Sequence, residues 1–195
     1  STDVRLENLV LTNGITTGND FGAGVRSNGD SLIVSGSVIT GNIATRGGGG
    51  FDLRGGGTVL IEHSLISHNQ ATNGSWGYGG GVHIAGPAVT MRNNTVDSNS
   101  GKFGAGVAQW SGNGLTVENS TISNNPIING GGGGGIFNRN SVLTVTNSTI
   151  SGNGRHGISN WQHGSDGATL FLTHSTVTDN AHNGVWQYVD NPAQP

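Results

Sequence analysis

Apolar residues recur in this chain with a short period of two residues inside a long period of 26 to 30 residues. In each long unit, two apolar residues stand two positions apart, which is typical of a strand with one buried face. These pairs are Val4 and Leu6, Leu32 and Val34, Val59 and Ile61, Val89 and Met91, Leu115 and Val117, Leu143 and Val145, and Leu170 and Leu172. The long period predicts a repeat architecture in which each unit buries its apolar face against its neighbours.

A second apolar position in each unit is followed three residues later by asparagine. The pairs are Ile39 and Asn42, Ile66 and Asn69, Val96 and Asn99, Ile122 and Asn125, Ile150 and Asn153, and Val177 and Asn180, with Leu11 and Gly14 as a degenerate first copy. The apolar residue predicts a second strand. Because the asparagine is needed in every unit, we interpret it as part of the scaffold and not as a catalytic group.

Two further columns predict where the chain bends and where a third strand begins. The bend column is Asn8, Gly36, His63, Asn93, Asn119, Asn147 and His174, where we expect left-handed backbone and amides hydrogen-bonded from unit to unit. The third strand opens at Val25, Phe51, Val82, Val107, Ile136, Ile158 and Val185, each directly preceded by glycine. A glycine in all seven copies indicates either a positive φ or backbone too crowded for a β-carbon.

Three short strands per unit, without a helical period, predict an all-β parallel β-helix, a solenoid of about seven three-strand coils. We expect one domain over residues 1–190 and a tail over 191–195, because no linker interrupts the repeat. The first repeat begins at once, which suggests a mature or excised fragment. Both ends of such a solenoid expose unpaired strand edges, so we expect further coils or a capping partner chain there.

Composition excludes several classes of partner and site. The net charge is −3, with only eight Lys plus Arg, so nucleic acid or an anionic membrane is not an expected partner. Cysteine is absent, which excludes disulfides and thiolate chemistry, and the sequence contains no apolar run long enough to insert in a membrane. No metal-ligand spacing of a known kind is present.

The recurring phrases Gly-(Gly/Ala)-Gly-(Val/Ile/Phe) and (Ile/Val)-x-x-Asn, over residues 4 to 190, resemble the repeats of chlamydial polymorphic outer-membrane proteins. More broadly, they are similar to the right-handed parallel β-helix repeats of the pectin-lyase-like superfamily and of bacterial surface proteins. The resemblance implies right-handed coils and an extracellular or cell-surface location. It leaves the activity open, because that superfamily includes polysaccharide lyases, glycoside hydrolases, epimerases, phage tailspikes and adhesin passengers.

On the third strand, the residues one and three places after the apolar residue are expected to face solvent. They include many aromatic and arginine side chains, which can stack on sugar rings and bind their hydroxyl or carboxylate groups. Glycine-rich loops add Trp76, Tyr78, Lys102 and Phe103 near the same edge. The candidate ligand-binding residues are Trp110, Phe137, Arg139, Trp161, Trp186, Tyr188, Arg155, His156 and His182. We therefore predict a module that binds a polysaccharide or cell-surface glycan; the alternative is that these rings cover the sheet or dock another domain.

A polysaccharide lyase acting on uronate polymers is the second hypothesis, with Asp52, Arg54, His83 and Arg139 as candidate catalytic residues. In the lyases that the chain resembles, a basic residue removes the proton beside a uronate carboxylate, which arginine or Ca²⁺ neutralises. Arg54 or Arg139 fits either role, and Asp52 is a candidate calcium ligand. Hydrolysis fits poorly, because this face offers only Asp52 before Asp190.

Ice binding is a third and minor hypothesis. Outward hydroxyl pairs on the second strand form a ladder at Thr121 and Ser123, Thr149 and Ser151, and Thr176 and Thr178. Earlier copies replace one hydroxyl by another side chain, as in Thr95 and Asp97, Leu65 and Ser67, or Val38 and Thr40. A surface that matches an ice lattice is expected to be more regular, and threonine is favoured in strands in any case.

Overall fold

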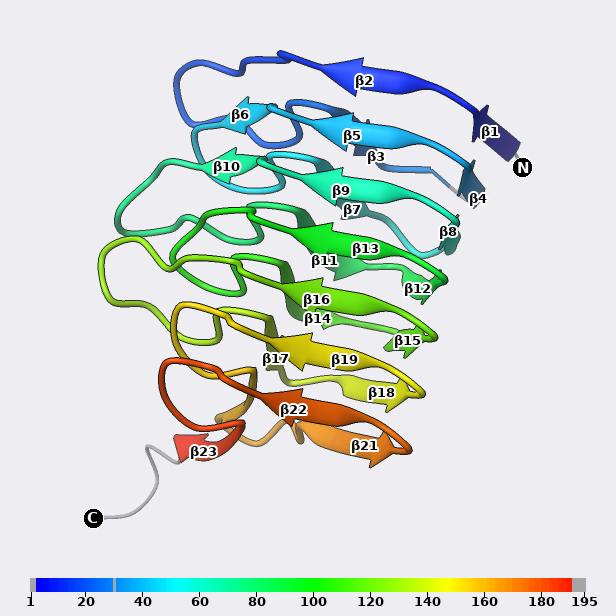
Figure 1. The fold of residues 1–195 in the computed structure, drawn as a ribbon. Coiled ribbons are helices and arrows are strands. Elements are labelled where there is room, and N and C mark those ends of the chain that lie inside the picture. The colour runs from blue at the N-terminus through cyan, green and yellow to red at the C-terminus, as the bar shows by residue number, and fades with distance from the viewer. Residues whose placement is uncertain (1–2, 30, 191–195) are drawn as a thin grey trace.

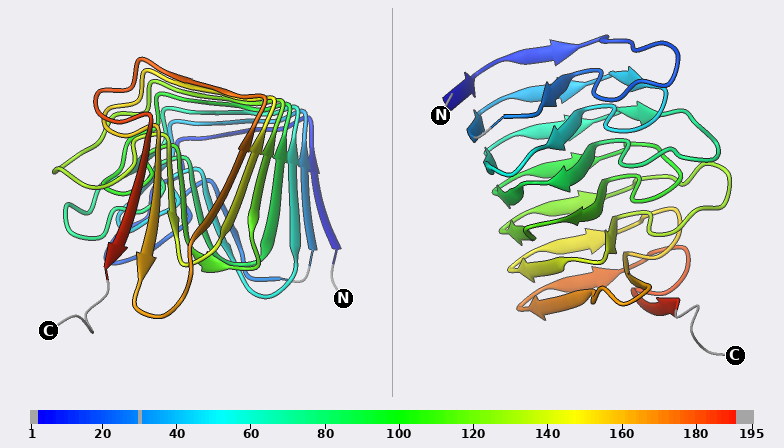
Figure 2. Two further views of the ribbon diagram at one scale, coloured as in Figure 1. Left: turned by 90° about the horizontal axis from the view of Figure 1, so that it is seen from below. Right: turned by 180° about the vertical axis from the view of Figure 1, so that it is seen from behind.

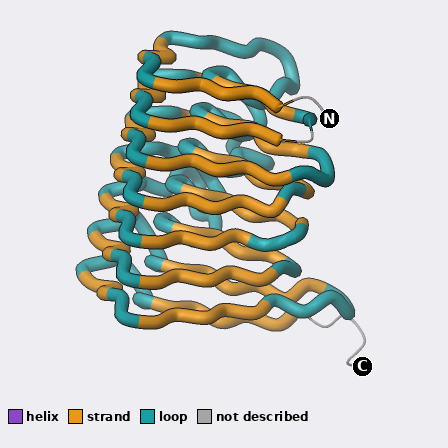
Figure 3. Tube along the Cα trace, turned by 90° about the vertical axis from the view of Figure 1, so that its right-hand side faces the viewer, coloured by secondary structure: helices purple, strands orange, loops and turns teal. Residues whose placement is uncertain are grey.

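The computed structural model describes residues 3–29 and 31–190 and is a parallel β-helix of seven coils (Figure 1). The predicted fold is confirmed. The described residues form strands and no helix (Figure 3), so none of them forms a helix that could cross a membrane. The predicted tail over 191–195 lies outside the described residues.

Three seven-stranded parallel sheets make the sides of the solenoid. The first sheet contains β1 (Asp3–Glu7), β4 (Ser31–Ser35), β8 (Thr58–Glu62), β12 (Ala88–Arg92), β15 (Leu115–Glu118), β18 (Val142–Thr146) and β21 (Thr169–Thr173). The second contains β2 (Val10–Thr12), β5 (Val38–Thr40), β9 (Leu65–Ser67), β13 (Thr95–Asp97), β16 (Thr121–Ser123), β19 (Thr149–Ser151) and β22 (Thr176–Thr178). The third contains β3 (Val25–Ser27), β7 (Phe51–Arg54), β11 (Val82–Gly86), β14 (Val107–Gly112), β17 (Ile136–Arg139), β20 (Ile158–His163) and β23 (Val185–Asp190).

The coils stack in register, so that equivalent residues lie above one another. In the view along the axis the coils superimpose, and the longest loops project at one corner (Figure 2). A short two-stranded sheet of β6 (Ile43–Ala44) and β10 (Gln70–Ala71) lies in these loops. The inward apolar residues, for example Val59, Val89 and Leu115 on paired strands, form one continuous buried core. The strands of the first and last coils pair on one side only within the described chain.

The recurrent asparagines form a ladder along the inside of the turn after the second sheet. Asn69 donates from its main-chain nitrogen and from Nδ2 to Oδ1 of Asn99, both at 3.0 Å, and Nδ2 also reaches the carbonyl of Ile39 at 2.9 Å. The same bonds repeat from Asn42 to Asn180. These asparagines hold one coil to the next, as the sequence interpretation proposed.

The bend column behaves only partly as expected. Its members have the predicted left-handed backbone, with φ between 47° and 59°. The expected amide ladder within this column is wrong, because Asn93, Asn119 and Asn147 are exposed. The inter-coil bonds are made one residue later, by the column Ser37, Ser64, Asn94, Ser120, Ser148 and Ser175, which is buried except for the half-buried Ser175.

The glycine column before the third sheet is explained by crowding and not by φ. A β-carbon at Gly106 would lie 2.7 Å from the carbonyl oxygen of Gly135, and one at Gly81 would lie 2.5 Å from that of Gly106. None of these glycines has a positive φ. In the copies from Gly24 to Gly157, a side chain would force adjacent coils apart, so these glycines set the coil spacing, whereas Gly184 in the last coil has no such close contact.

Candidate functional site

The loops that precede the third sheet fold over its outer face. Phe21, Gly47, Tyr78 and Phe103 stack on one another through isolated β-bridges between coils. The first outward column of the sheet is buried beneath them, with Asp52, Ala108, Phe137 and Ser159 at 0% exposure and His83 at 4%. The expectation that these residues face solvent is therefore wrong: Phe137 is packed under Phe103, with ring centroids 5.3 Å apart.

The second outward column remains accessible. Arg54, Trp110, Arg139 and Trp161 are half-buried, and Tyr188 is exposed. This column keeps the orientation expected from the sequence. A ligand can therefore reach only one of the two columns directly over most of the sheet.

The rings on this face form one continuous row along the solenoid. Successive ring centroids are 4.8 to 5.8 Å apart, a spacing typical of favourable aromatic pairs. In order, the row is Phe21, His83, Tyr78, Phe103, Phe137, Trp161, Tyr188, Trp186, His156 and His182. The aromatic residues thus serve as structural cover as well as lining surface.

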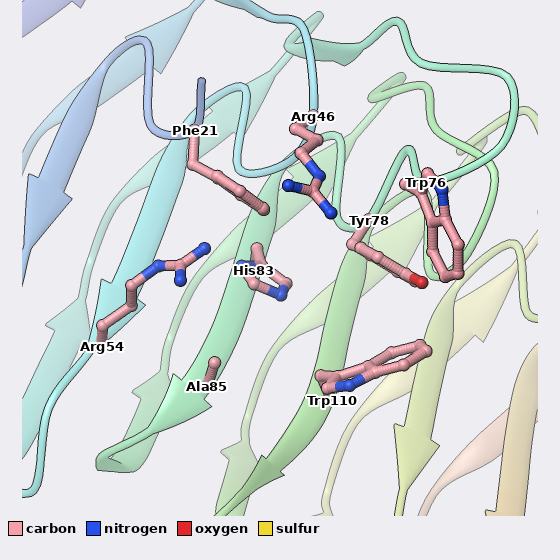
Figure 4. Close-up of a pocket in the computed structure, with 8 residues that line it drawn as sticks. All are labelled: Phe21, Arg46, Arg54, Trp76, Tyr78, His83, Ala85 and Trp110. Atoms are coloured by element: carbon pink, nitrogen blue, oxygen red, sulfur yellow. The ribbon is translucent and has the colours of Figure 1, made fainter. Parts of the chain in front are cut away.

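A first cavity of about 240 Å³ lies beside the stacked loop residues Phe21, Gly47 and Tyr78. Gly47 provides no aromatic ring there, unlike its two neighbours in the stack. His83 takes the position of the missing ring, stacked between Phe21 at 5.4 Å and Tyr78 at 5.8 Å. The lining residues, drawn in Figure 4, are Phe21, Arg46, Arg54, Trp76, Tyr78, His83, Ala85 and Trp110.

Asp52 lies beneath this cavity and is fully engaged. His83 Nδ1 is 2.8 Å from Oδ1, Arg54 Nε is 2.8 Å from Oδ2, and Arg26 Nε is 3.5 Å from Oδ2. Burial acts to raise the pKa of Asp52, but the hydrogen bonds and charges of His83 and Arg54 outweigh it and hold the pKa below its usual value. Because both oxygens are occupied and shielded, Asp52 is not placed to ligate calcium as proposed from the sequence.

A second cavity, of about 430 Å³, adjoins the first and shares Trp76, Tyr78 and Trp110 with it. It also includes Ser75, Phe103, Arg139, Trp161, His163 and Asp190. We call the two cavities together the aromatic groove. The Arg139 guanidinium lies 4.0 Å from the centre of the Trp110 ring, a cation–π contact, and His163 Nδ1 lies 2.9 Å from Asp190 Oδ2.

The tyrosine at the junction of the two cavities is buried. Tyr78 is 5% exposed, and burial raises the pKa of its hydroxyl to about 12. Trp110 packs on it at 4.3 Å, and Trp76 lies 6.1 Å away with 49% of its surface exposed. Tyr78 therefore supports the two tryptophans, and Trp76 is the more accessible platform.

The remaining predicted ligand residues lie outside the aromatic groove. Arg155 and Trp186 line a third hollow of about 330 Å³, which shares Phe103 and Trp161 with the second cavity. Arg155 Nη1 donates there to the carbonyls of Gly130 and Gly131. His156 is buried against Trp186 at 4.8 Å and contacts the exposed His182 at 5.5 Å. These residues bind the C-terminal loops to the sheet.

Four groove residues, Phe21, Arg46, Ser75 and His163, were not found by sequence reasoning. A signal existed, because Phe21, Gly47, Tyr78, Phe103 and Gly132 all stand four residues before the start of a third-sheet strand. An aromatic residue in that column covers the outer face of the third sheet with a ring, and a glycine leaves that part of the face uncovered by a loop ring.

Two further observations concern metal ligands and the hydroxyl ladder of the second sheet. Over residues 3–29 and 31–190, no three His, Cys, Asp or Glu side chains gather in a way that could hold a metal. In the hydroxyl ladder of the second sheet, Asp97 accepts hydrogen bonds from Ser98, Ser123 and Asn124. Burial raises the pKa of Asp97, but these bonds outweigh that effect and lower it, so part of the ladder is occupied internally.

Comparison with known proteins supports the fold assignment alone. No curated protein and no solved structure matches the chain. The family model described as "Right handed beta helix region" matches residues 2–122, which is more than half of the sequence. The chain therefore belongs to the right-handed β-helix family.

Proposed function

We propose that the protein is a non-catalytic module that binds an extended polysaccharide in the aromatic groove. The observation that carries this proposal is that Trp76 and Trp110 line both adjoining cavities and Trp161 lines the second. Indole rings stack on the apolar faces of sugars, and they do so with little loss of side-chain entropy.

The spacing of the tryptophans supports an extended ligand. Trp110 is on β14 and Trp161 is on β20, which are separated in the third sheet by β17. Two strand spacings place these residues roughly 10 Å apart along the axis. A single ring cannot contact both, whereas a chain of sugars lying along the axis can.

Polar side chains complement the rings. Arg54 and Arg139 lie in the same outward column as the two tryptophans, and their planar guanidinium groups can donate to hydroxyl or carboxylate oxygens. Asp190 can accept hydrogen bonds from sugar hydroxyls. The groove thus has the composition of a carbohydrate site, with stacking surfaces and a few directional groups.

We further propose that the module acts outside the cell, in a secreted or cell-surface bacterial protein, where it mediates adhesion to glycans. The support is the resemblance of its repeats to those of bacterial surface proteins. Additional coils or a partner chain would pair with the open strand edges of the first and last coils.

Binding is tested by titrating the protein with a panel of polysaccharides and following tryptophan fluorescence. Trp110→Ala and Trp161→Ala should each weaken binding of the best polymer by about tenfold, the loss expected for one stacking contact. Phe171→Ala is the matched control, because Phe171 is 56% exposed on the first sheet, away from the groove. Unchanged affinity in both tryptophan variants, or no binding to any polymer, would reject the proposal.

A lyase remains the second candidate because of one feature of the first cavity. Asp52 accepts a hydrogen bond from His83 Nδ1, and both His83 and Arg54 line the cavity (Figure 4). In this arrangement His83 is the candidate base and Arg54 the group that neutralises a uronate carboxylate. Ultraviolet absorbance of unsaturated products, lost in His83→Ala, would establish this activity; binding without product would leave the non-catalytic module.

A further inference from the structure

Two arginines converge on the first cavity over the same ring. The Arg54 guanidinium carbon is 4.1 Å from the centroid of Phe21, and that of Arg46 is 5.3 Å from it. Arg46 comes from the loop before β7 and Arg54 from the end of β7. Figure 4 shows both guanidinium groups directed toward the space around His83.

This cavity has an excess of positive charge in a chain that is acidic as a whole. The protein carries a net charge of −3 with only eight Lys plus Arg, yet Arg46 and Arg54 both line this cavity. The carboxylate of Asp52 beneath it is shared by Arg54 and Arg26. Arg54 contacts that carboxylate through Nε alone, and among the described residues no carboxylate pairs with Arg46. Like charges held together in a half-enclosed space are unfavourable, and a bound anion relieves them.

The floor of the cavity leaves room for such an anion. Ala85 has the smallest side chain in the outward column that otherwise carries Asn28, Arg54, Trp110, Arg139, Trp161 and Tyr188. The pairing of β11 with β14 also shifts register between Ile84 and Ala85. The cavity is therefore open between Arg54 on one side and the Trp110 ring on the other.

We infer that this cavity is a subsite for an oxyanion substituent, a carboxylate or sulfate, carried by a sugar of the polysaccharide bound in the aromatic groove. The sugar ring packs on Trp110, and its anionic group accepts hydrogen bonds from the terminal nitrogens of Arg46 and Arg54. Ala85 determines how large a group enters. The inference rests on the proposed glycan binding and adds the class of glycan.

The test compares each charged polymer with its neutral counterpart. The probes are a polyuronate and its carboxyl-reduced form, and a sulfated galactan and its desulfated form, titrated by tryptophan fluorescence at low salt. Wild-type protein should bind at least one charged polymer about tenfold more tightly than the neutral form, because charge-assisted hydrogen bonds are among the stronger ones. The pair that shows the difference identifies carboxylate or sulfate as the ligand group.

Two variants test whether the preference for the charged polymer arises in the first cavity. Arg46→Gln removes one guanidinium that pairs with no described carboxylate, and Ala85→Leu fills the floor without changing charge. Both should lose the preference for the charged polymer over its neutral form. Arg5→Gln is the matched control, because Arg5 is exposed on the first sheet. Thermal unfolding verifies that each variant is folded.

The outcomes separate this inference from the proposal on which it rests. Equal binding of charged and neutral polymers that still depends on Trp110 would overturn the oxyanion subsite and leave glycan binding intact. A charge preference that persists in both Arg46→Gln and Ala85→Leu would place the anion elsewhere and also overturn it. Failure of every polymer to bind would reject both.

Discussion

The asparagine ladder and the outer face of the third sheet follow opposite rules in the same coils. Along the ladder, each asparagine from Asn42 to Asn153 makes the same two bonds to the next. On the outer face, the equivalent positions carry Arg54, Ala85, Trp110 and Arg139 in successive coils. Recurrence therefore marks what holds the coils together, and variation marks where chemistry can differ from coil to coil.

The physical reason lies in the parallel, in-register stacking of coils. A buried side chain above a buried side chain must satisfy the same hydrogen-bond partners in every coil, so one residue type recurs. The outer face has no such requirement, because its side chains contact solvent or loops of varying length. A row of unlike rings and arginines can be placed there without disturbing the interior.

One position on the varied outer face, Phe137, is nevertheless buried and should contribute to stability as a core residue does. Phe137→Ala should lower the free energy of unfolding by about 4 kcal/mol, since it leaves a cavity under Phe103. Phe171→Ala, at a 56% exposed position, should change it by less than about 0.5 kcal/mol. Urea denaturation measures both. Similar small losses in the two variants would mean that Phe137 is not covered by the loop.

The sequence predicted the repeated features better than the varied ones. The seven coils, the strand positions and the inward asparagines follow from columns such as Ile66 and Asn69, because burial and hydrogen bonding leave few alternatives there. The pattern did not show which residue at the bend forms the hydrogen bonds between coils. Asn93 and Asn94 are neighbours and both asparagine, yet only Asn94 forms them.

The candidate site was predicted only in part. Strand alternation correctly directed Trp110, Arg139 and Trp161 outward. It did not reveal that loops fold over Asp52, His83 and Phe137, because alternation describes the strand alone and contains nothing about what packs on its outer face. The cavity at Gly47 depends on a missing ring in a loop, and such an absence becomes informative only when adjacent coils are placed together.

The second prediction tests whether the ladder acts as a unit. Asn99→Ala removes Oδ1, which accepts from two donors of Asn69, and Nδ2, which donates to Ile66 and Asn125. It should therefore lower the free energy of unfolding by about 3 kcal/mol. Asn113→Ala is the control, because Asn113 is exposed and has no positive φ. Amide hydrogen exchange should accelerate at Asn69. Equal stability of the two variants would show that the ladder contributes no more than a surface asparagine.

The smallest expected effect is a pH dependence at the C-terminal end of the aromatic row. Burial, together with the positive charges of Arg155 and His182, lowers the pKa of His156 below its ordinary value of 6.5. Below pH 6.5, His156 binds a proton in the unfolded chain more readily than in the folded protein. The contribution of neutral His156 to stability is therefore complete above pH 6.5 and is lost as the pH falls through the folded pKa.

Unfolding free energies measured between pH 7 and 5 should therefore decrease less steeply in His156→Gln than in wild type. Ser159→Ala, a buried and non-titrating change on β20, should shift stability equally at both pH values. A slope that is the same in all three proteins would mean that His156 is not desolvated by Trp186, and that the row loosens toward its last coil.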